Sequence, residues 1–364
     1  MQKRNKNKRI SLFAYVTFAI FIIIEILLGI SKSNINFADT VNSTVSSAFR
    51  KLMASISSPL PFSVFEVLIA LIPLWVVLII IFAVRSFKRR RGARFIINLA
   101  SVVLLLISGH NLALGIGYNT TPLSERLSLD SVPVTKDNLA AAMISLRDEV
   151  NELAPRVAFS DGETRYGEDM DALTAEILDS YSDFSREYSF PDILDSRAKP
   201  IHFSNVMSYF RITGIYTYYT GEANVNIAYP DYDIAFTTAH ELSHQRGILR
   251  ENEANFMAYL ICARADSDYL KYSASLSLYE YISSALYRTD KELYREISAG
   301  LCDVARADIK ASSAVTQKYG NTPLADISNT INDLFLKSNG TEGVISYSMV
   351  VKLAISYFSA NGRI

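Results

Sequence analysis

The sequence predicts an α+β protein in which three N-terminal transmembrane helices precede a mainly helical domain with a small sheet. Of its 364 residues 49% are hydrophobic, and the mean hydropathy is positive, which is too apolar for one ordinary soluble domain. The apolar excess lies near the N-terminus. The rest of the chain is mostly helical in pattern, with one region rich in β-branched and aromatic residues.

Three apolar runs near the N-terminus are each about 20 residues long, enough for a helix to cross a bilayer. They are Ile10 to Ile30, Phe62 to Val84 and Phe95 to Tyr118, and we expect spans at about 10–30, 62–84 and 95–117 of a membrane domain covering 1–117. The alternative for the first run is a cleaved signal peptide, because basic residues precede it. Its apolar core is longer than the roughly 7–15 residues of such signals, so we expect it to be retained.

Two polar side chains within these runs need a partner or water, because a charge in hydrocarbon is costly. They are Glu25 in the first run and His110 in the third. A functional role is one interpretation. Helix-to-helix packing or a position near the membrane surface is the interpretation that we favour for both.

Basic residues set the expected orientation. They are concentrated before the first run and in RSFKRRRGAR (Arg85 to Arg94), so the N-terminus and the second loop are expected in the cytoplasm. Three spans then place residues 118–136, a linker rich in proline and small polar residues, and a domain over 137–364 outside the cytoplasm. The apolar stretch Val344 to Phe358 is short and contains Lys352, which favours a core helix.

The expected domain contains both cysteines, Cys262 and Cys302. A disulfide is permitted outside the cytoplasm, but two cysteines in helix-like segments do not make a framework. We therefore favour two buried thiols over a bridge.

Apolar spacing predicts helices from Asn138 to Pro155, after Met170, and over most of the chain beyond the motif described next. The later helices are expected at Glu251–Ala265, Ser267–Arg288, Lys291–Lys318 and Leu324–Lys337. The segment Ile201 to Asp233 fits two or three short strands, and Asp233 is expected to cap the helix that follows.

The segment TTAHELSHQRGILRENEANF (Thr237 to Phe256) contains two histidines four residues apart. On a helix, His240 and His244 share one face and can bind the same metal ion. Glu241 is offset by about 100° and can reach a water bound to the metal, which is the general-base position of the HExxH metallopeptidases. Zinc suits imidazole and carboxylate ligands in an open tetrahedral site. Composition alone would give this motif in only about two of a thousand such chains, so chance or mere helix packing is a weak explanation.

The third ligand has to lie close to His244 in space. Gly247 can end the helix and reverse the chain, and HELSHQRGILR resembles the metzincin arrangement HExxHxxGxxH, except that Arg250 occupies the position of the third histidine. The next run, ENEAN, resembles the Glu-x-x-Ala-Asn run of HExxH families that use a glutamate ligand. This resemblance implies that Glu251 binds the metal and that Asn255 supports the site, although gluzincins place the glutamate further along the chain. Glu253 is the rival ligand, and a remote residue is a third possibility.

Three neighbouring features compete for a role at the site. TGEANVN (Thr220 to Asn226) is either an edge strand that pairs with substrate or a structural hairpin. Three tyrosines and one histidine could each donate a hydrogen bond to the oxyanion of the reaction, although packing is the favoured interpretation for each of them: Tyr216, Tyr218, Tyr219 and His202. Arg246 and Arg250 could bind a substrate carboxylate or orient Glu251, but solvated charge is the favoured interpretation.

Three apolar runs followed by GIYTYYTGEANVN and HELSHQRGILRENEANF resemble a family of bacterial membrane proteins catalogued as domain-of-unknown-function family 3810. The resemblance covers most of the chain and is specific between about Gly214 and Leu260. It implies a zincin-like fold and a metallopeptidase.

The function expected from these residues is that of a membrane-anchored, zinc-dependent peptidase that hydrolyses peptide bonds outside the cytoplasm. His240, His244 and Glu251 would hold Zn²⁺, and Glu241 would be the general base. The expected partners are the lipid bilayer and a peptide, protein or cell-wall peptide substrate, with no nucleic acid. The alternative is a catalytically silent zincin-like sensor or scaffold that binds peptides or cell-wall components.

Overall fold

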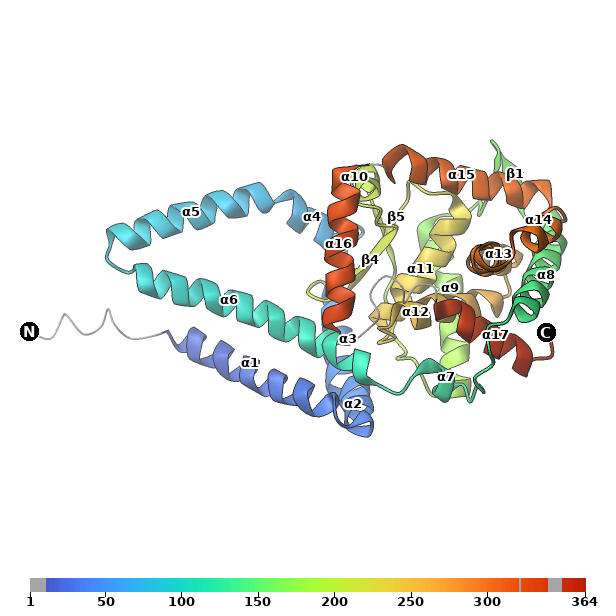
Figure 1. Cartoon of the computed structure of the whole chain (residues 1–364). Coiled ribbons are helices and arrows are strands. Elements are labelled where there is room, and N and C mark those ends of the chain that lie inside the picture. The colour runs from blue at the N-terminus through green and yellow to red at the C-terminus, as the bar shows by residue number, and fades with distance from the viewer. Residues whose placement is uncertain (1–10, 321, 340–348) are drawn as a thin grey trace, which may run out of the picture. The chain divides into compact units, whose positions relative to one another are not determined.

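The computed structural model describes residues 11–320, 322–339 and 349–364. The chain divides into two compact units, which we describe separately (Figure 1). Unit 1 comprises residues 1–120 and the tetrapeptide Tyr218–Gly221, and unit 2 comprises Thr121–Thr217 and Glu222–Ile364. The chain therefore passes between the units three times.

Unit 1 is helical. Its elements are α1 (Leu12–Ser31), α2 (Ile35–Val41), the π-helical turn η2 (Asn42–Ser46), α3 (Ser47–Ser57), α4 (Val64–Ala70), α5 (Ile72–Lys88), α6 (Gly92–Ala113) and the 3₁₀ turn η3 (Gly115–Asn119). Ser11 begins α1, because its side chain accepts a hydrogen bond from the N–H of Ala14.

Three side-chain hydrogen bonds fix the register of α1 against α6. Ser11 Oγ donates to Asn98 Oδ1 at 2.7 Å, Asn111 Nδ2 donates to Glu25 Oε1 at 2.6 Å, and Asn119 Nδ2 donates to Ser31 Oγ at 3.2 Å. The partners follow each other in the same order along both segments, so the two helices run parallel. The carboxylate of Glu25 thus joins two helices, which agrees with the packing interpretation. His110 packs edge-on against the ring of Tyr218.

The expectation of three continuous spans is wrong. By length and composition, two helical segments are fit to cross a membrane: Leu12–Ser31 and Gly92–Asn119. The second expected span is broken into α4 and α5, which meet at an angle of 54°, and a third crossing exists only if this bent pair counts as one span. The break has a local cause, because Pro73 in the first turn of α5 has no N–H to continue the hydrogen bonding of α4.

The tetrapeptide Tyr218–Gly221 is held within unit 1. Tyr218 Oη donates to the carbonyl oxygen of Leu106 at 2.9 Å, and the ring of Tyr219 lies 6.4 Å from that of Phe65. Gly221 has φ +69°, and a Cβ there would collide with the backbone of Ala54.

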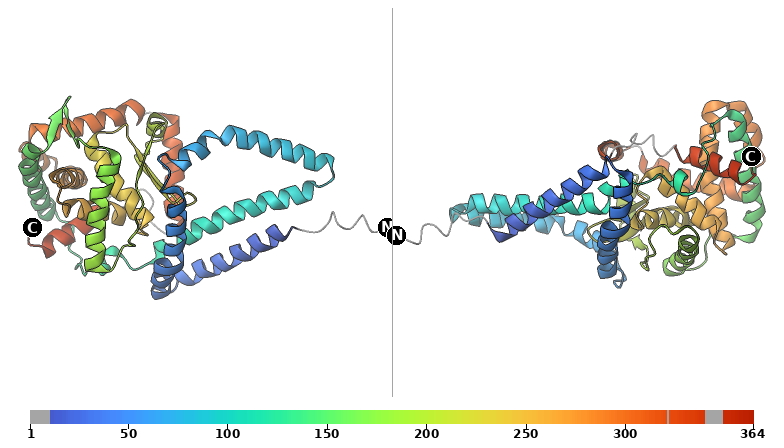
Figure 2. Two further views of the ribbon diagram at one scale, coloured as in Figure 1. Left: turned by 180° about the vertical axis from the view of Figure 1, so that it is seen from behind. Right: turned by 90° about the horizontal axis from the view of Figure 1, so that it is seen from below.

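Unit 2 is mostly helical, as the sequence predicts. Its helices are α7 (Leu123–Arg126), α8 (Lys136–Leu153), the turn η4 (Ala154–Arg156), α9 (Met170–Tyr188), α10 (Ser204–Tyr209), α11 (Asp231–Gln245), α12 (Glu251–Ala263), α13 (Asp268–Thr289), α14 (Lys291–Ser298), α15 (Asp303–Gly320), α16 (Pro323–Ser338) and α17 (Val350–Ala360). Helix α13 packs against α8, α11 and α12, and these four helices build most of the core (Figure 2).

The small sheet of unit 2 has the strand order β3-β5-β4. Its strands are β3 (Lys199–Ile201), β4 (Gly214–Thr217) and β5 (Glu222–Asn226), with β3 parallel and β4 antiparallel to β5. Residues Ala223 and Val225 of β5 enter the core. Of the two interpretations of Thr220–Asn226, the structural hairpin is confirmed, because β4 and β5 are antiparallel neighbours joined through Gly221. The edge-strand interpretation is wrong, because β5 is the central strand.

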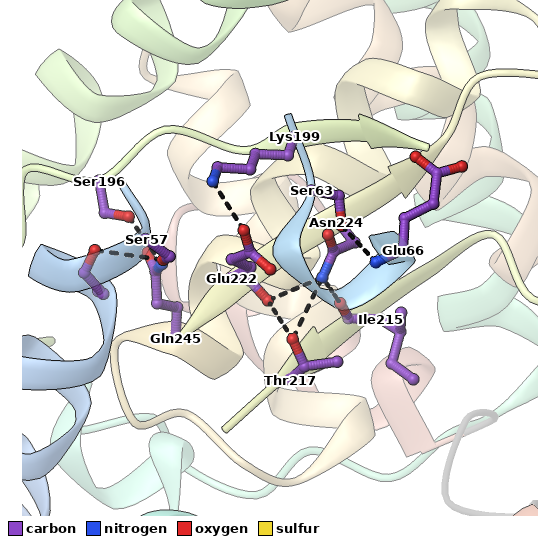
Figure 3. A network of polar contacts seen from close by, with 11 residues as sticks. Ser57, Ser63, Glu66, Ser196, Lys199, Ile215, Thr217, Glu222, Asn224 and Gln245 are labelled. Atoms are coloured by element: carbon purple, nitrogen blue, oxygen red, sulfur yellow. Dashed lines mark hydrogen bonds and ion pairs between the residues drawn. The ribbon is translucent and has the colours of Figure 1, made fainter. Parts of the chain in front are cut away.

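Two buried polar residues of β5, Glu222 and Asn224, have partners on the neighbouring strands (Figure 3). Lys199 Nζ on β3 forms a fully buried ion pair with Glu222 Oε1 at 2.7 Å. Asn224 Nδ2 donates to the carbonyl oxygen of Ile215 at 3.2 Å and to Thr217 Oγ1 at 3.3 Å, which ties β5 to β4. These contacts explain how a strand with alternating polar residues stays buried.

Several element boundaries differ from the prediction. Asp233 does not cap α11, which begins at Asp231, so Asp233 lies in its first turn. The helix expected from Lys291 to Lys318 is broken, because Asn151 binds both Gly300 O and Cys302 N between α14 and α15. A second sheet, the hairpin of β1 (Ala158–Ser160) and β2 (Glu163–Arg165), was not predicted.

The two cysteines are free thiols, and Cys262 is fully buried whereas Cys302 is partly buried. The preference for thiols over a bridge is confirmed. The C-terminal core helix is also present as α17, although residues 344–348 of the expected stretch lie outside the described residues.

Candidate metal centre

Helix α11 carries the HELSH motif and is fixed by its neighbours. The hydroxyl of Tyr181 on α9 donates to the carbonyl oxygen of Ala239 at 2.7 Å, and Ser273 Oγ on α13 donates to that of Tyr232 at 2.6 Å. Because the histidines are four residues apart, their rings lie on one face with centroids 4.6 Å apart.

The chain reverses immediately after this helix at Gly247, which has φ +89°. The N–H of Ile248 donates to Ser243 O at 3.0 Å, and the N–H of Gly247 donates to His244 O at 3.0 Å. This pair of bonds is the Schellman motif, which satisfies the last carbonyls of α11. The reversal lets α12 start at Glu251, only a few residues later, and return its first turn toward the histidines.

The two histidines and Glu251 form a compact cluster. His240 Nε2 lies 3.4 Å from Glu251 Oε2, and His244 Nε2 lies 3.7 Å from Glu251 Oε1. The three ligand atoms, one per residue, lie within 4.8 Å of one another, and this is the metal-ligand group found among the described residues. Each of the three side chains keeps a little exposure, 12–13%, so the cluster is accessible from solvent.

The donor set fits zinc. Tetrahedral ligands at about 2.0–2.2 Å from zinc are about 3.3–3.6 Å apart, close to the two distances from Glu251. His244 Nδ1 lies 2.8 Å from the carbonyl oxygen of Ile248, which can only accept, so Nδ1 keeps its proton and, in the neutral ring, Nε2 offers its lone pair to a cation. Nδ1 of His240 is buried and has no hydrogen-bond partner in the described chain. A cation bound at Nε2 of His240 would keep the single ring proton on Nδ1.

The electrostatics of the cluster favour a cation. Burial alone would lower the pKa of His244, but the charge and hydrogen bond of Glu251 outweigh burial and raise this pKa to about 9. Burial would raise the pKa of Glu251, but the charges and hydrogen bonds of the two histidines hold it well below its usual range. A proton thus occupies the position that a divalent cation would take, and metal binding would release it.

Glu241 lies beside the cluster and is 4% exposed. The backbone N–H of Tyr216 on β4 donates to its carboxylate, while Oε2 is buried without a partner in the described residues. Burial raises the pKa of Glu241, against the charges of the two histidines. A carboxylate oxygen without a hydrogen-bond donor, beside a metal-ligand cluster, has the environment expected of a proton acceptor.

The close approach of β4 to Glu241 was not predicted from the sequence. A Cβ on Gly214 would lie 2.5 Å from Glu241 Oε1 and 2.7 Å from Thr237 Cγ2, so only glycine fits there without displacing the carboxylate. The sequence signal was a glycine at the start of a segment rich in β-branched and aromatic residues.

Glu253, the rival ligand, has other partners. Its Oε1 accepts hydrogen bonds from the N–H of Leu123 at 2.9 Å and from Arg250 Nη1 at 3.0 Å. It is therefore part of the packing around the first turn of α12. Asn255 is buried, but its Nδ2 has no hydrogen-bond partner in the described chain, so the structure gives it no bond to the cluster.

The remaining candidate side chains are not among the metal-ligand group of the described residues. Arg246 is buried at 2% exposure, donates to Leu242 O and Leu194 O, and lies over the ring of Tyr181, so the expectation of solvated charge is wrong for it. His202 is exposed. Tyr218 and Tyr219 belong to unit 1, whereas Tyr216 contributes its backbone N–H to Glu241.

Comparison with known proteins gives one match. No curated protein and no solved structure matches the chain. The sequence model of a family described as "Protein of unknown function (DUF3810)" matches residues 41–355, which include the HELSH motif, β4, β5 and Glu251. The chain therefore belongs to the DUF3810 family.

Proposed function

We propose that the protein is a membrane-anchored, zinc-dependent peptidase with a zincin-like catalytic domain. The observation that carries the proposal is the convergence of His240, His244 and Glu251 within 4.8 Å, beside the unpartnered carboxylate oxygen of Glu241. This combination supplies three metal ligands, an open position and a base, the set that metal-assisted hydrolysis of an amide requires.

His240, His244 and Glu251 would hold the ion. When bound, zinc supplies Lewis acidity that polarises the scissile carbonyl and lowers the pKa of water. Glu241 accepts a proton from the attacking water through Oε2 and passes it to the leaving amine nitrogen. The N–H of Tyr216 keeps the carboxylate oriented during both transfers.

The edge position of β4 suits an extended peptide. A substrate that lies along the outer side of β4 would run past Glu241, because Gly214 approaches that side chain closely. Because α1 and α6 run parallel, the chain has to return across the membrane between them, so this proposal counts the bent pair α4 and α5 as one span. With the basic residues before α1 and between α5 and α6 in the cytoplasm, unit 2 then lies outside it, where secreted proteins and cell-wall peptides are the accessible substrates.

The test is the variant Glu241→Gln in the full chain, purified in detergent and loaded with zinc. The variant should retain about one zinc per chain and lose chelator-sensitive cleavage of a peptide library, because Gln cannot accept the proton. Undiminished cleavage by Glu241→Gln would rule out the mechanism. Bound zinc without cleavage of any peptide by the unsubstituted protein would favour a binding scaffold instead.

A further inference from the structure

Helix α16 presents an apolar face to solvent. Four of its apolar side chains recur at helical spacing and are about half exposed or more: Leu324 44%, Ile327 53%, Ile331 62% and Leu334 63%. The opposite side of the same helix carries Ala325 and Leu336, which are fully buried. One side of α16 therefore belongs to the packed protein, and the exposed stripe points away from it.

Helix α10 extends this apolar surface. Thr322, just before α16, donates its hydroxyl to the carbonyl oxygen of Tyr209 at 3.1 Å, and the rings of Tyr209 and Tyr319 lie 4.9 Å apart, so α10 and the start of α16 are neighbours (Figure 1). Around α10 the exposed apolar residues are Phe203 60%, Val206 54% and Tyr209 43%. We call the exposed residues of α10 and α16 together the α10–α16 surface.

A surface of this kind in a soluble monomer marks an interaction site, because contiguous apolar patches are rarely left in water. The connectivity of the chain identifies the partner. The apolar helical segment Gly92–Asn119 is fit to cross a membrane, and unit 2 begins at Thr121, so one residue separates them. The chain returns to unit 1 at Tyr218–Gly221. Unit 2 is thus tethered within a few residues of a bilayer.

We propose that the α10–α16 surface is a membrane-docking surface, with α16 lying in the headgroup region of the leaflet at which α6 ends. Its composition is that of an interfacial helix: a stripe of leucine and isoleucine, with a polar flank in which Lys337 and Asp333 are ion-paired at 2.7 Å. Tyrosine and phenylalanine on α10 are side chains that favour the membrane interface. The charges described on α16 are Asp326, Asp333 and Lys337, so docking relies on apolar burial and needs no anionic lipid.

This inference is independent of the peptidase proposal, because it concerns neither the metal cluster nor hydrolysis. It is tested with nitroxide labels on the full chain in nanodiscs of phosphatidylcholine. The labelled variants are Ile331→Cys, on the stripe, and Asn329→Cys, an exposed position about 160° away around the same helix. Both carry Cys302→Ser, whereas Cys262 can stay because it is fully buried.

Power saturation with oxygen, which partitions into lipid, and with a water-soluble nickel complex reports the surroundings of each label. The oxygen-to-nickel accessibility ratio should be at least about fivefold higher at position 331 than at 329, with no change when anionic lipid is added. Equal access of nickel to both labels would overturn the proposal. Exclusion of both reagents from position 331 would overturn it too, since it indicates a protein partner such as a second copy.

Labelling should leave the protein folded, because both positions are exposed and outside the core. An unchanged unfolding temperature of each labelled variant in detergent verifies this. A second readout uses Ile327→Asp combined with Ile331→Asp. These charges should lower the oxygen-to-nickel ratio of a label at Leu334→Cys to that of Asn329→Cys, and an unaltered ratio would contradict docking through this stripe.

Discussion

Two glutamates in the first turn of α12 have different environments although one residue separates them. Glu251 points to the histidines, whereas Glu253 accepts hydrogen bonds from the Leu123 N–H and Arg250. Sequence periodicity could not choose between them, because both have apolar residues one turn on. The choice depends on partners that are distant in the sequence, His240 and Leu123.

This difference gives a test of the ligand set. Glu251→Gln should weaken zinc binding at least about 100-fold, since the loss of a supporting residue already costs 10–100-fold. Glu253→Gln is the matched control and should leave zinc affinity within about threefold, with a loss of stability of about 1–2 kcal/mol from the weakened hydrogen bonds. Zinc titration against a competing chelator measures both. The assignment fails if the two variants exchange these effects.

Glu280 on α13 makes stability depend on pH. Burial and the neighbouring charge of Asp233 raise its pKa to about 8, while Tyr232 donates to Glu280 Oε2 at 3.1 Å. In the unfolded chain the pKa is near 4.5. Between these values the folded state holds a proton that the unfolded state lacks, so stability is highest below pH 4.5 and falls as pH rises to about 8, by at most about 1.4 kcal/mol per pH unit for this group.

Glu280→Gln should remove this contribution, because the amide keeps an acceptor oxygen for Tyr232 and does not ionise. The unfolding temperature of the variant minus that of the unsubstituted chain should therefore increase as pH rises from 5 to 8.5. Thermal unfolding in detergent measures it. Parallel curves for the two proteins would contradict the assignment. A residual slope in the variant is expected from Asp233, whose pKa burial raises to about 7.

At the scale of elements, β4 and α11 approach each other at Gly214. A methyl group there would press on Glu241 Oε1 and Thr237 Cγ2. Gly214→Ala should therefore shift the carboxylate and lower kcat for peptide cleavage about 100-fold, because small displacements of a catalytic group have effects of that size. Zinc content should not change. Gly29→Ala in α1 is the control, since a Cβ there meets nothing within 4 Å. Unchanged kcat in Gly214→Ala would show that the approach has no role.

Elements were predictable where the signal is local. HELSH and Gly247 encode a helix, two histidines on one face and a reversal within about ten residues, and all are present. The break between α4 and α5 was not predicted, because the mean hydropathy of a long window is hardly changed by a single residue such as Pro73. The β1–β2 hairpin was missed although Asp161–Gly162 is the dipeptide that favours such turns.

What local patterns could not supply is pairing between distant segments. The central position of β5 depends on β3, which precedes it by more than 20 residues, and on the buried pair of Lys199 with Glu222. Likewise, no residue near Gly214 in the sequence indicates that the side chain of Glu241 packs against it. Such contacts are set by the whole packing arrangement, so local patterns do not reveal that β4 lies at an edge of the sheet and β5 at its centre.

At the scale of the whole molecule, α7 joins the segment after α6 to the core of unit 2. Leu123 is 1% exposed within that core, and its N–H is bound by Glu253. Leu123→Ala should lower the free energy of unfolding of unit 2 by about 2–5 kcal/mol, as for other buried leucines. Ile144→Ala, at a 39% exposed position on α8, should change it by no more than about 0.5 kcal/mol. Denaturant unfolding of the full chain in detergent compares them, and equal effects would contradict a core role for Leu123.

The bond between Leu123 and Glu253 also decides where a water-soluble fragment of this protein should be cut. A fragment starting at residue 137 would remove a core leucine and take from Glu253 its backbone donor, two residues from the proposed ligand Glu251. A fragment starting at Thr121 keeps both. In that fragment the tetrapeptide Tyr218–Gly221 would lack unit 1, to which its two tyrosines belong. It should therefore be replaced by a short hydrophilic linker before crystallisation.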